Sequence, residues 1–363
     1  MPKRLSFVFL LTFLFILYFT MTKVIVLLFI GVLIFTSCNN DKNQPKNSEG
    51  TNTMSIDTSS KQKVSVQEQR IQKLEFNYTV GETLRYKMEQ NDEIEQDDSI
   101  KAKNNTTLYY TKVITSNKNG ILIFTMTYDS VMVYQKSPTA GSLGGNEVKF
   151  NSNDSADKQN KNYAIFNALV GQPITVTMTN KGKIEEISGL TPVMNTLLKD
   201  SPNASSIPEQ QKSQMADQIR LGMFAQIIQQ EQITLPDSTL DSTMTWSRTS
   251  PQEIPPLFVS TSTVQYSIGN VSKIEDHKVA DVKANLTGKI ELIKSKIPIP
   301  VKLKSSSMTG SGKTFIDVDR GYTLLKDTKV VLSIVAESTN PKTKKVEQMK
   351  QVKKTEMHVV KLK

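Results

Sequence analysis

From residue 74 to the C-terminus, apolar and polar residues alternate over long stretches of this sequence. Leu84-Arg85-Tyr86-Lys87-Met88 is one such stretch, and Thr111-Lys112-Val113-Ile114 is another. In a β-strand, successive side chains point to opposite faces, so a period of two predicts strands with one buried and one solvated face. Asn119-Gly120, just before Ile121, is a strong signal for a tight hairpin turn. The sequence therefore predicts antiparallel strands.

Further strands are expected where β-branched and aromatic residues gather between turn signals. A second hairpin is predicted by residues 174–178, the turn 180–183 and a return strand at 184–187. The other expected strands cover residues 121–134, 262–271, 278–293, 297–308, 313–319, 322–336 and 346–362. The glycines of Thr309-Gly310-Ser311-Gly312 fall between two of these strands and predict a turn or bulge there.

Two segments have the three-to-four residue spacing of a helix. Residues 190–198 predict a short helix with Pro192 near its first turn, and residues 208–232 predict a long helix that ends before Pro236. The apolar face of the long helix consists of Met215, Ile219, Met223, Phe224, Ile227 and Ile228. Such a face usually packs against a sheet. The alternatives are that it binds a partner or lines a cavity for an apolar ligand.

These elements predict an α+β fold that is mainly antiparallel β. We expect a large curved sheet, either a half-barrel or two similar halves, with a short and a long amphipathic helix packed on one face. The globular domain is expected at 71–363, with a helical insert at about 190–232. A duplication would place the halves at 71–190 and 236–363. Tyr78-Thr-Val-Gly81 and Tyr266-Ser-Ile-Gly269 favour it, but short echoes also arise by chance, so both alternatives stay open.

The first 37 residues have the layout of a signal peptide. A basic start at residues 1–4 leads into an apolar run that ends at Phe19, and a second apolar run covers 24–35. A signal peptide needs only one run, so Met21 is an alternative start of translation, in which case residues 1–20 are not made. The other alternative is an uncleaved membrane anchor. Each run alone is shorter than the ~20 apolar residues that span a bilayer, and Lys23 separates them.

Phe35-Thr36-Ser37-Cys38 resembles a lipobox, the site at which a dedicated peptidase cuts before a lipidated cysteine. The resemblance implies that Cys38 carries lipid and anchors the mature chain in a bilayer. Cys38 is the only cysteine, so the exported part has no thiol left for a disulfide. Residues 38–70 are rich in polar side chains and predict a disordered tether. We expect a location in the cell envelope, at the outer membrane, on either its periplasmic or its outer face.

The chain is basic, with a net charge of +10. Residues 1–37 contain three basic residues and no acid, so the mature chain keeps +7. The excess lies near the C-terminus, in Lys342, Lys344, Lys345, Lys350, Lys353, Lys354, Lys361 and Lys363. A basic flank attracts anionic lipid or nucleic acid, but proteins that bind single strands interleave aromatic residues with the basic ones. These lysines have no such neighbours, and lysines also keep exposed strands soluble. We expect no nucleic-acid partner.

No catalytic, metal or nucleotide motif is complete. The segment 309–314 ends like a phosphate-binding loop, but residue 307 is serine where glycine is required, and a strand rather than a helix is expected to follow. His277 and His358 lack the i, i+4 partner of a zinc-binding helix and are expected to be exposed. The acidic cluster at 92–98 lacks the spacing of a calcium loop and is expected at a solvated hairpin tip. We expect no metal, no cofactor and no enzymatic activity.

Three segments resemble parts of a family of Bacteroidota envelope lipoproteins with no assigned function. They are the Leu-Pro, turn and Trp-bearing strand from Leu235 to Trp246, residues 78–86, and residues 182–189. The resemblance covers roughly residues 74–340 and implies location more than activity. The expected function is therefore non-enzymatic binding or scaffolding at a membrane, with another envelope protein as one partner. The alternatives are a carrier of an apolar ligand or lipid beneath the 208–232 helix, and an envelope hydrolase without a recognisable motif.

Overall fold

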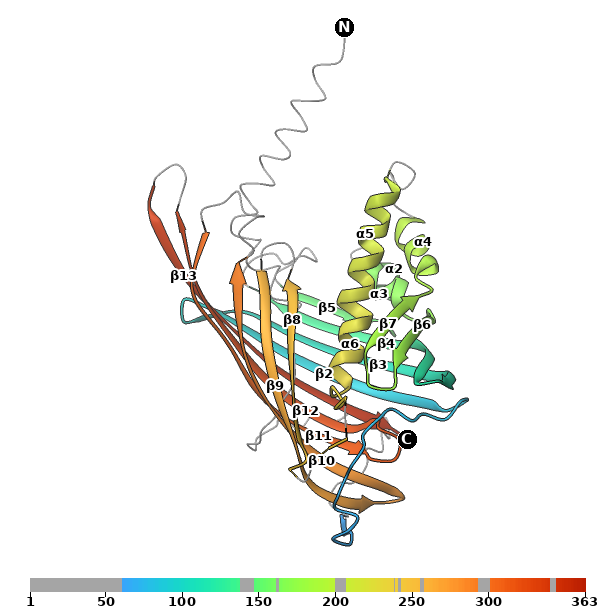
Figure 1. Cartoon of the computed structure of the whole chain (residues 1–363). Helices are drawn as coiled ribbons and strands as arrows, with labels where there is room; N and C mark the ends of the chain where they lie inside the picture. The colour runs from blue at the N-terminus through green and yellow to red at the C-terminus, as the bar shows by residue number, and fades with distance from the viewer. Residues whose placement is uncertain are drawn as a thin grey trace.

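The computed structural model describes residues 61–137, 147–160, 163–199, 207–237, 239–240, 243–254, 258–292, 301–339 and 344–363. Cys38, the expected signal peptide and most of the expected tether lie outside these residues. Thirteen strands form one sheet, and a long helix lies along its inner side (Figure 1). The predicted fold class, α+β and mainly antiparallel with helices on one face of a large curved sheet, is confirmed.

All pairings between the named strands are antiparallel, in the order β1-β9-β10-β11-β12-β13-β2-β3-β4-β6-β7, with β5 also paired to β4 and β8 to β9. The strands are β1 (Gln62–Lys63), β2 (Thr83–Gln96), β3 (Ser99–Lys118), β4 (Ile121–Lys136), β5 (Glu147–Asn151), β6 (Ile174–Thr179), β7 (Ile184–Ser188), β8 (Thr245–Ile254), β9 (Phe258–Ile274), β10 (His277–Leu292), β11 (Val301–Asp317), β12 (Thr323–Thr339) and β13 (Val346–Leu362). The early and late strands of the chain therefore form two sides of one sheet, which meet where β13 pairs with β2.

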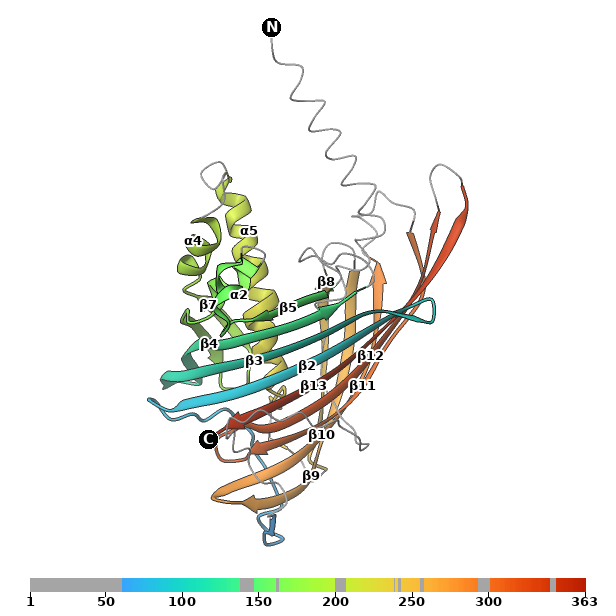
Figure 2. The ribbon, with the colours of Figure 1, turned by 180° about the vertical axis from the view of Figure 1, so that it is seen from behind.

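The alternation in sequence matches the two faces of this sheet. In β4, every second residue from Leu122 to Tyr128 is buried, and the residues between them are more accessible. The convex face is polar and carries cross-strand ion pairs, including Lys354–Glu95 at 2.5 Å and Lys329–Glu356 at 2.8 Å. Figure 2 shows this face, with β2, β3, β4 and β13 running side by side. Several of the C-terminal lysines are therefore paired with carboxylates of neighbouring strands.

Residues 309–312 do not form the turn that separates two strands in the sequence-based prediction. They lie inside β11, which is continuous from Val301 to Asp317. A Cβ atom on Gly310 would lie 2.8 Å from the Lys329 carbonyl oxygen, and one on Gly288 would lie 2.9 Å from that of Thr261. These glycines let neighbouring strands approach closely where the sheet bends. The segment is thus a strand without the helix that a phosphate-binding loop requires.

The helices gather on the concave side of the sheet (Figure 1). They are α2 (Ser155–Gln159), α3 (Ala164–Leu169), α4 (Thr191–Lys199), α5 (Glu209–Ile219), the π-helical segment η4 (Arg220–Ala225) and α6 (Gln226–Glu231). The last three are continuous and form the long helix predicted at 208–232, while α4 is the short helix predicted at 190–198. No helix in the described ranges has both the length and the apolar character needed to cross a bilayer.

Candidate functional site

A pocket of about 780 Å³ opens between α4, α5 and the edge strand β7. We call it the α4–α5 pocket. Its apolar lining consists of Ile187, Leu190, Met194, Leu198 and Ala216. Its polar lining consists of Glu185, Glu186, Ser188, Thr191, Asn195, Glu209, Lys212, Ser213 and Arg220, together with Gly189. The volume lies within the range of roughly 300–1,000 Å³ that is typical of small-molecule sites.

Local sequence explains how β7 and α4 form one wall of the pocket. Gly189 has φ +90°, a conformation that favours glycine, and it turns the chain from β7 into α4. Pro192 lies in the first turn of α4, where its missing N–H costs little. Leu190 and Met194 are buried one turn apart and supply the apolar floor.

The opposite wall is one stripe of α5 and η4. Glu209, Lys212, Ser213, Ala216 and Arg220 recur at spacings of three and four residues, so they share a helix face. Lys212 forms a 2.6 Å ion pair with Glu209. This stripe is not predictable from the sequence, because its side chains are polar and polar helix residues usually face solvent.

Arg220 joins the helix wall to the strand wall. Its Nε donates a 3.0 Å hydrogen bond to the carbonyl oxygen of Ile187, and its guanidinium pairs with Asp217. β7 is the last strand of the sheet, so no further strand is available to donate a hydrogen bond to the Ile187 carbonyl oxygen. Arg220 supplies that donor. Arg220 thereby fixes the distance between η4 and β7 at one end of the pocket.

The six residues predicted to form the apolar face of the long helix pack against the sheet. Ile219, Phe224, Ile227 and Ile228 are buried in the hydrophobic core, and Met215 and Met223 are half-buried against it. Phe224 stacks on Tyr128 of β4 with ring centroids 4.9 Å apart, and the Tyr128 hydroxyl donates to the Met223 carbonyl oxygen at 2.7 Å. None of the six lines the α4–α5 pocket.

A buried polar cluster holds the C-terminal end of α6, and we call it the helix-end cluster. Lys112 of β3 and Glu231 of α6 form an ion pair at 2.5 Å, and both side chains are completely buried. The Tyr110 hydroxyl donates to the same carboxylate oxygen at 2.8 Å. From β12, Thr323 donates to the Glu231 carbonyl oxygen at 2.8 Å, and Lys326 donates to the Gln232 carbonyl oxygen at 2.5 Å. The cluster therefore satisfies carbonyls at the helix end.

Burial strongly perturbs the ionisable groups around this cluster. Loss of hydration lowers the pKa of Lys112, and the Glu231 carboxylate acts in the opposite direction. Burial also raises the pKa of four tyrosines on the concave face, Tyr78, Tyr86, Tyr110 and Tyr128, with the Glu231 charge contributing for the first three. Because the clustered side chains are enclosed on all sides, we assign them a positioning role rather than contact with a ligand.

A second buried ion pair lies on the concave face between β2 and β13. Asp92 is 3.2 Å from Lys353 and accepts hydrogen bonds from Thr355 at 2.5 Å and Gln90 at 2.8 Å. Burial lowers the pKa of Lys353. The expected solvated hairpin tip at 92–98 is therefore only partly correct: residues 97 and 98 form the turn, with positive φ, whereas Asp92 lies inside the sheet.

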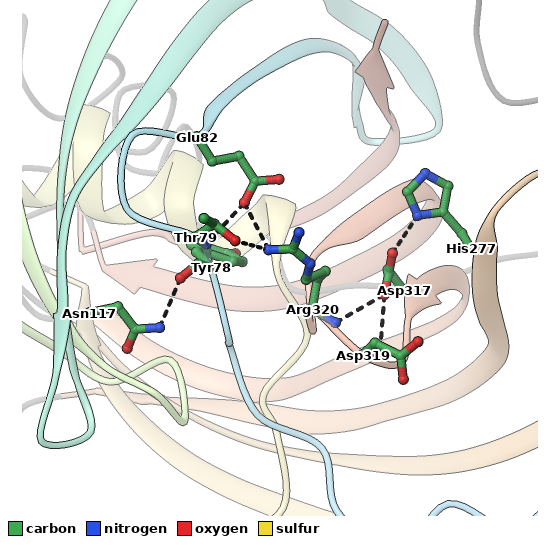
Figure 3. Close-up of polar contacts among 8 residues, drawn as sticks. All are labelled: Tyr78, Thr79, Glu82, Asn117, His277, Asp317, Asp319 and Arg320. Carbon is green, nitrogen blue, oxygen red and sulfur yellow. Dashed lines mark hydrogen bonds and ion pairs between the residues drawn. The ribbon is translucent and has the colours of Figure 1, made fainter.

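Polar contacts hold the segment before β2 against β3 and against the turn between β11 and β12 (Figure 3). Asn117 donates to the Tyr78 carbonyl oxygen at 2.8 Å. Arg320, in the turn between β11 and β12, bonds to the Thr79 hydroxyl and lies 3.5 Å from Glu82. The same turn is capped by Asp317, which accepts from the backbone N–H of Arg320 at 2.9 Å. These contacts are typical of a structural turn.

Both histidines have carboxylate partners. The Nδ1 of His277 lies 2.5 Å from Asp317, and that of His358 lies 2.6 Å from Asp327. Figure 3 shows the contact between His277 and Asp317. Both histidines are half-buried, whereas the sequence-based expectation was that they are exposed. The described contacts of each ring include no hydroxyl group, and no group of three or more metal-ligating side chains occurs among the residues that the structure describes.

A protein-family model matches residues 119–325, more than half of the chain, and its description is Family of unknown function (DUF6263). The chain belongs to this family. The expectation of membership in a family without an assigned function is thereby confirmed. In this DUF6263 member, the match contains the whole α4–α5 pocket and the Glu231 half of the helix-end cluster, whereas Lys112 and Lys326 lie outside it.

Solved structures show remote likenesses. Lipovitellin, in a structure concerned with its lipid–protein interactions, is 11% identical with a TM-score of 0.41, over 79% of this chain and 26% of lipovitellin. An outer membrane channel from Pseudomonas putida F1 is 8% identical with a TM-score of 0.21, over 79% of this chain and 97% of the channel. The chain thus spans about a quarter of the length of lipovitellin. No curated protein sequence matches it. We draw no function from these likenesses.

Proposed function

We propose that this chain is a non-enzymatic binding protein of the bacterial cell envelope that holds a small ligand in the α4–α5 pocket. The pocket is the observation that carries the proposal. It combines a ligand-sized volume, an apolar floor and a charged rim. Its lining contains no histidine or cysteine, and Glu185, Glu186 and Glu209 are exposed, so the pocket offers carboxylates without the burial that tunes a catalytic acid or base.

The envelope location rests on the N-terminal sequence. Cys38 is the only cysteine, ends an apolar run and is followed at once by polar residues. In our proposal, lipid on Cys38 holds the chain at the outer membrane. The polar tether that follows leads to β1, which pairs with β9 through Gln62 and Lys63. A tether of this composition would hold the sheet and its pocket away from the bilayer surface.

Pocket binding is tested by filling the pocket from an exposed position. Ser213 lines the pocket and is exposed, so Ser213→Trp should fill it without disturbing the core. Gln218→Trp is the matched control, because Gln218 is also exposed on α5 but does not line the pocket. Native mass spectrometry of the purified proteins should show a copurifying small molecule in wild type and Gln218→Trp, and its loss in Ser213→Trp. Equal retention in both variants would contradict the pocket assignment.

Anchoring is tested separately with Cys38→Ser. Wild-type protein should fractionate with membranes and carry an acyl mass on its N-terminal residue after processing. The variant should lose both properties while its fold, measured by circular dichroism, stays the same. If the variant remains membrane-bound, the anchor is an uncleaved helix or another surface, and the lipoprotein proposal is wrong.

A further inference from the structure

We infer that the ligand of the α4–α5 pocket is a single-chain amphiphile with a zwitterionic headgroup. This inference rests on the proposed function and names its ligand class. It follows from the arrangement of apolar, cationic and anionic side chains on the walls of the pocket.

The apolar part of the pocket suits a hydrocarbon chain. Ile187, Leu190 and Met194 are buried, and Leu198 and Ala216 are half-buried beside them. The helix wall extends from Glu209 to Arg220, a length of about 16 Å at the helical rise of 1.5 Å per residue. A wall of this length can accommodate one extended chain. Burial of a chain there provides binding energy in proportion to the apolar area removed from water.

The helix wall carries one cation that a ligand can recruit. Lys212 lines the pocket and is 28% exposed, while its partner Glu209 is 88% exposed. Ion pairs with such exposure contribute little, so a ligand anion can compete with Glu209 at small cost. Arg220 is less available, because it binds both Asp217 and the Ile187 carbonyl oxygen.

The strand wall carries the opposite charge. Glu186 lines the pocket, is exposed, and has no ion pair among the residues that the structure describes. The neighbouring Glu185 is already paired with Lys183 at 2.9 Å. The pocket lining therefore holds one available cation on α5 and one available anion on β7, together with its apolar residues.

This arrangement discriminates between headgroups. A purely anionic amphiphile is attracted by Lys212 and repelled by Glu186. A purely cationic one is attracted by Glu186 and repelled by Lys212. A zwitterion places each of its charges beside a complementary wall. Specificity here comes from repulsion of the wrong headgroups as much as from attraction of the right one.

Three twelve-carbon amphiphiles that differ only in headgroup test the inference: dodecylphosphocholine, dodecyl sulfate and dodecyltrimethylammonium. Each is titrated by calorimetry, below its critical micelle concentration, into the full mature chain with Cys38→Ser. Dodecylphosphocholine should bind at least about fivefold more tightly than either singly charged probe, the ratio expected for one weak ionic contact. Equal or tighter binding of a singly charged probe would overturn the headgroup assignment and leave the pocket proposal standing.

Charge variants provide the second readout. Lys212→Gln should weaken dodecylphosphocholine and dodecyl sulfate but not dodecyltrimethylammonium, and Glu186→Gln should weaken dodecylphosphocholine and the cationic probe but not dodecyl sulfate. Lys199→Gln, at an exposed position of α4 outside the pocket lining, should change none of them. Ser213→Trp should abolish binding. If no probe binds to wild type, or if binding survives Ser213→Trp, the proposed function fails together with this inference.

Discussion

Replacing Lys112 by methionine should destabilise the protein far more than replacing any exposed lysine. The Lys112–Glu231 pair is completely buried, with its charged atoms 2.5 Å apart. Lys112→Met keeps most of the side-chain volume but leaves a buried carboxylate whose remaining described donor is the Tyr110 hydroxyl. Breaking one partner of a buried ion pair costs about 3–5 kcal/mol. We expect a loss of this size in the free energy of unfolding.

The double variant Lys112→Met with Glu231→Leu separates the pair from the packing around it. It removes both charges, so no ion is left buried, and the main remaining cost is the Tyr110 hydroxyl without its acceptor. An unsatisfied buried group costs about 1–3 kcal/mol. The double variant should therefore be more stable than Lys112→Met alone, a strongly non-additive result that is expected of residues in direct contact.

Urea denaturation followed by circular dichroism measures these differences, with the midpoint compared at constant slope. Lys183→Met is the matched control, since Lys183 is 74% exposed and pairs only with an exposed glutamate. Its effect should stay below about 1 kcal/mol. Our interpretation of the helix-end cluster is refuted if Lys112→Met costs no more than this control, or if the losses of the two single variants simply add.

Three other predictions follow from buried or strained groups. The four concave-face tyrosines have raised pKa values, so above pH 10 the folded state keeps protons that the unfolded state releases, and each tyrosine should lower the free energy of unfolding by about 1.4 kcal/mol per pH unit. Burial lowers the pKa of Lys112 and Lys353, which offsets this loss of stability up to pH 10.5. Unfolding with a rise in tyrosinate absorbance is therefore expected above pH 10.5. The Asp327 carboxylate raises the pKa of His358 above 6.5, so the contact between them stabilises the fold fully below pH 6.5, and this stabilisation is lost as pH rises through the folded-state pKa. Asp327→Asn should return the His358 pKa, measured by NMR, toward 6.5. Gly321→Ala should be more destabilising in a thermal melt than Gly81→Ala, since both glycines have positive φ but only a Cβ at 321 would meet a backbone oxygen, at 2.1 Å.

The periodicity of apolar residues predicted the regular elements well because each element has one buried and one solvent-exposed face. The helix predicted at 208–232 is observed at 209–231, and the expected strand at 346–362 has the same bounds in the structure. Asn119-Gly120 forms the expected hairpin turn, with both residues at positive φ. Local pattern suffices in these cases because the local preference and the tertiary environment agree.

Local pattern failed where a residue type has two structural uses. Glycines commonly mark turns, so the glycines of residues 309–312 led to a prediction of two strands where the structure has the single strand β11. In the structure, Gly310 lets β11 and β12 approach closely, a use that depends on the neighbouring strand and leaves no local mark. Likewise, the acidic residues at 92–98 divide between a turn and the buried Asp92, because strand alternation continues through the first part of the cluster.

The buried ion pairs did have a signal in the sequence. Lys112 shares its strand face with Tyr110 and Ile114, and Asp92 shares its face with Met88 and Ile94. A charged residue at an inward position of an alternating strand must be paired when buried. The partner of Lys112 is not predictable in the same way, since Glu231 comes from a helix more than a hundred residues later in the sequence. The pocket is harder still, because it depends on how α4, α5 and β7 are placed relative to one another.

The long helix is fixed to the rest of the protein unevenly along its length. Its C-terminal end is held by the helix-end cluster, and its middle by Arg220 against β7. Toward the N-terminus of the helix, Ile219 is the one fully buried residue of α5, and Met215 and Ala216 are half-buried against the core. Most of the other residues of α5 line the pocket or are exposed. A segment with few buried contacts is the part of a structure that opens most easily. In the proposed complex, ligand contacts with Ala216 and Lys212 would add order where the fold itself supplies least, and would couple binding in the pocket to the position of α5.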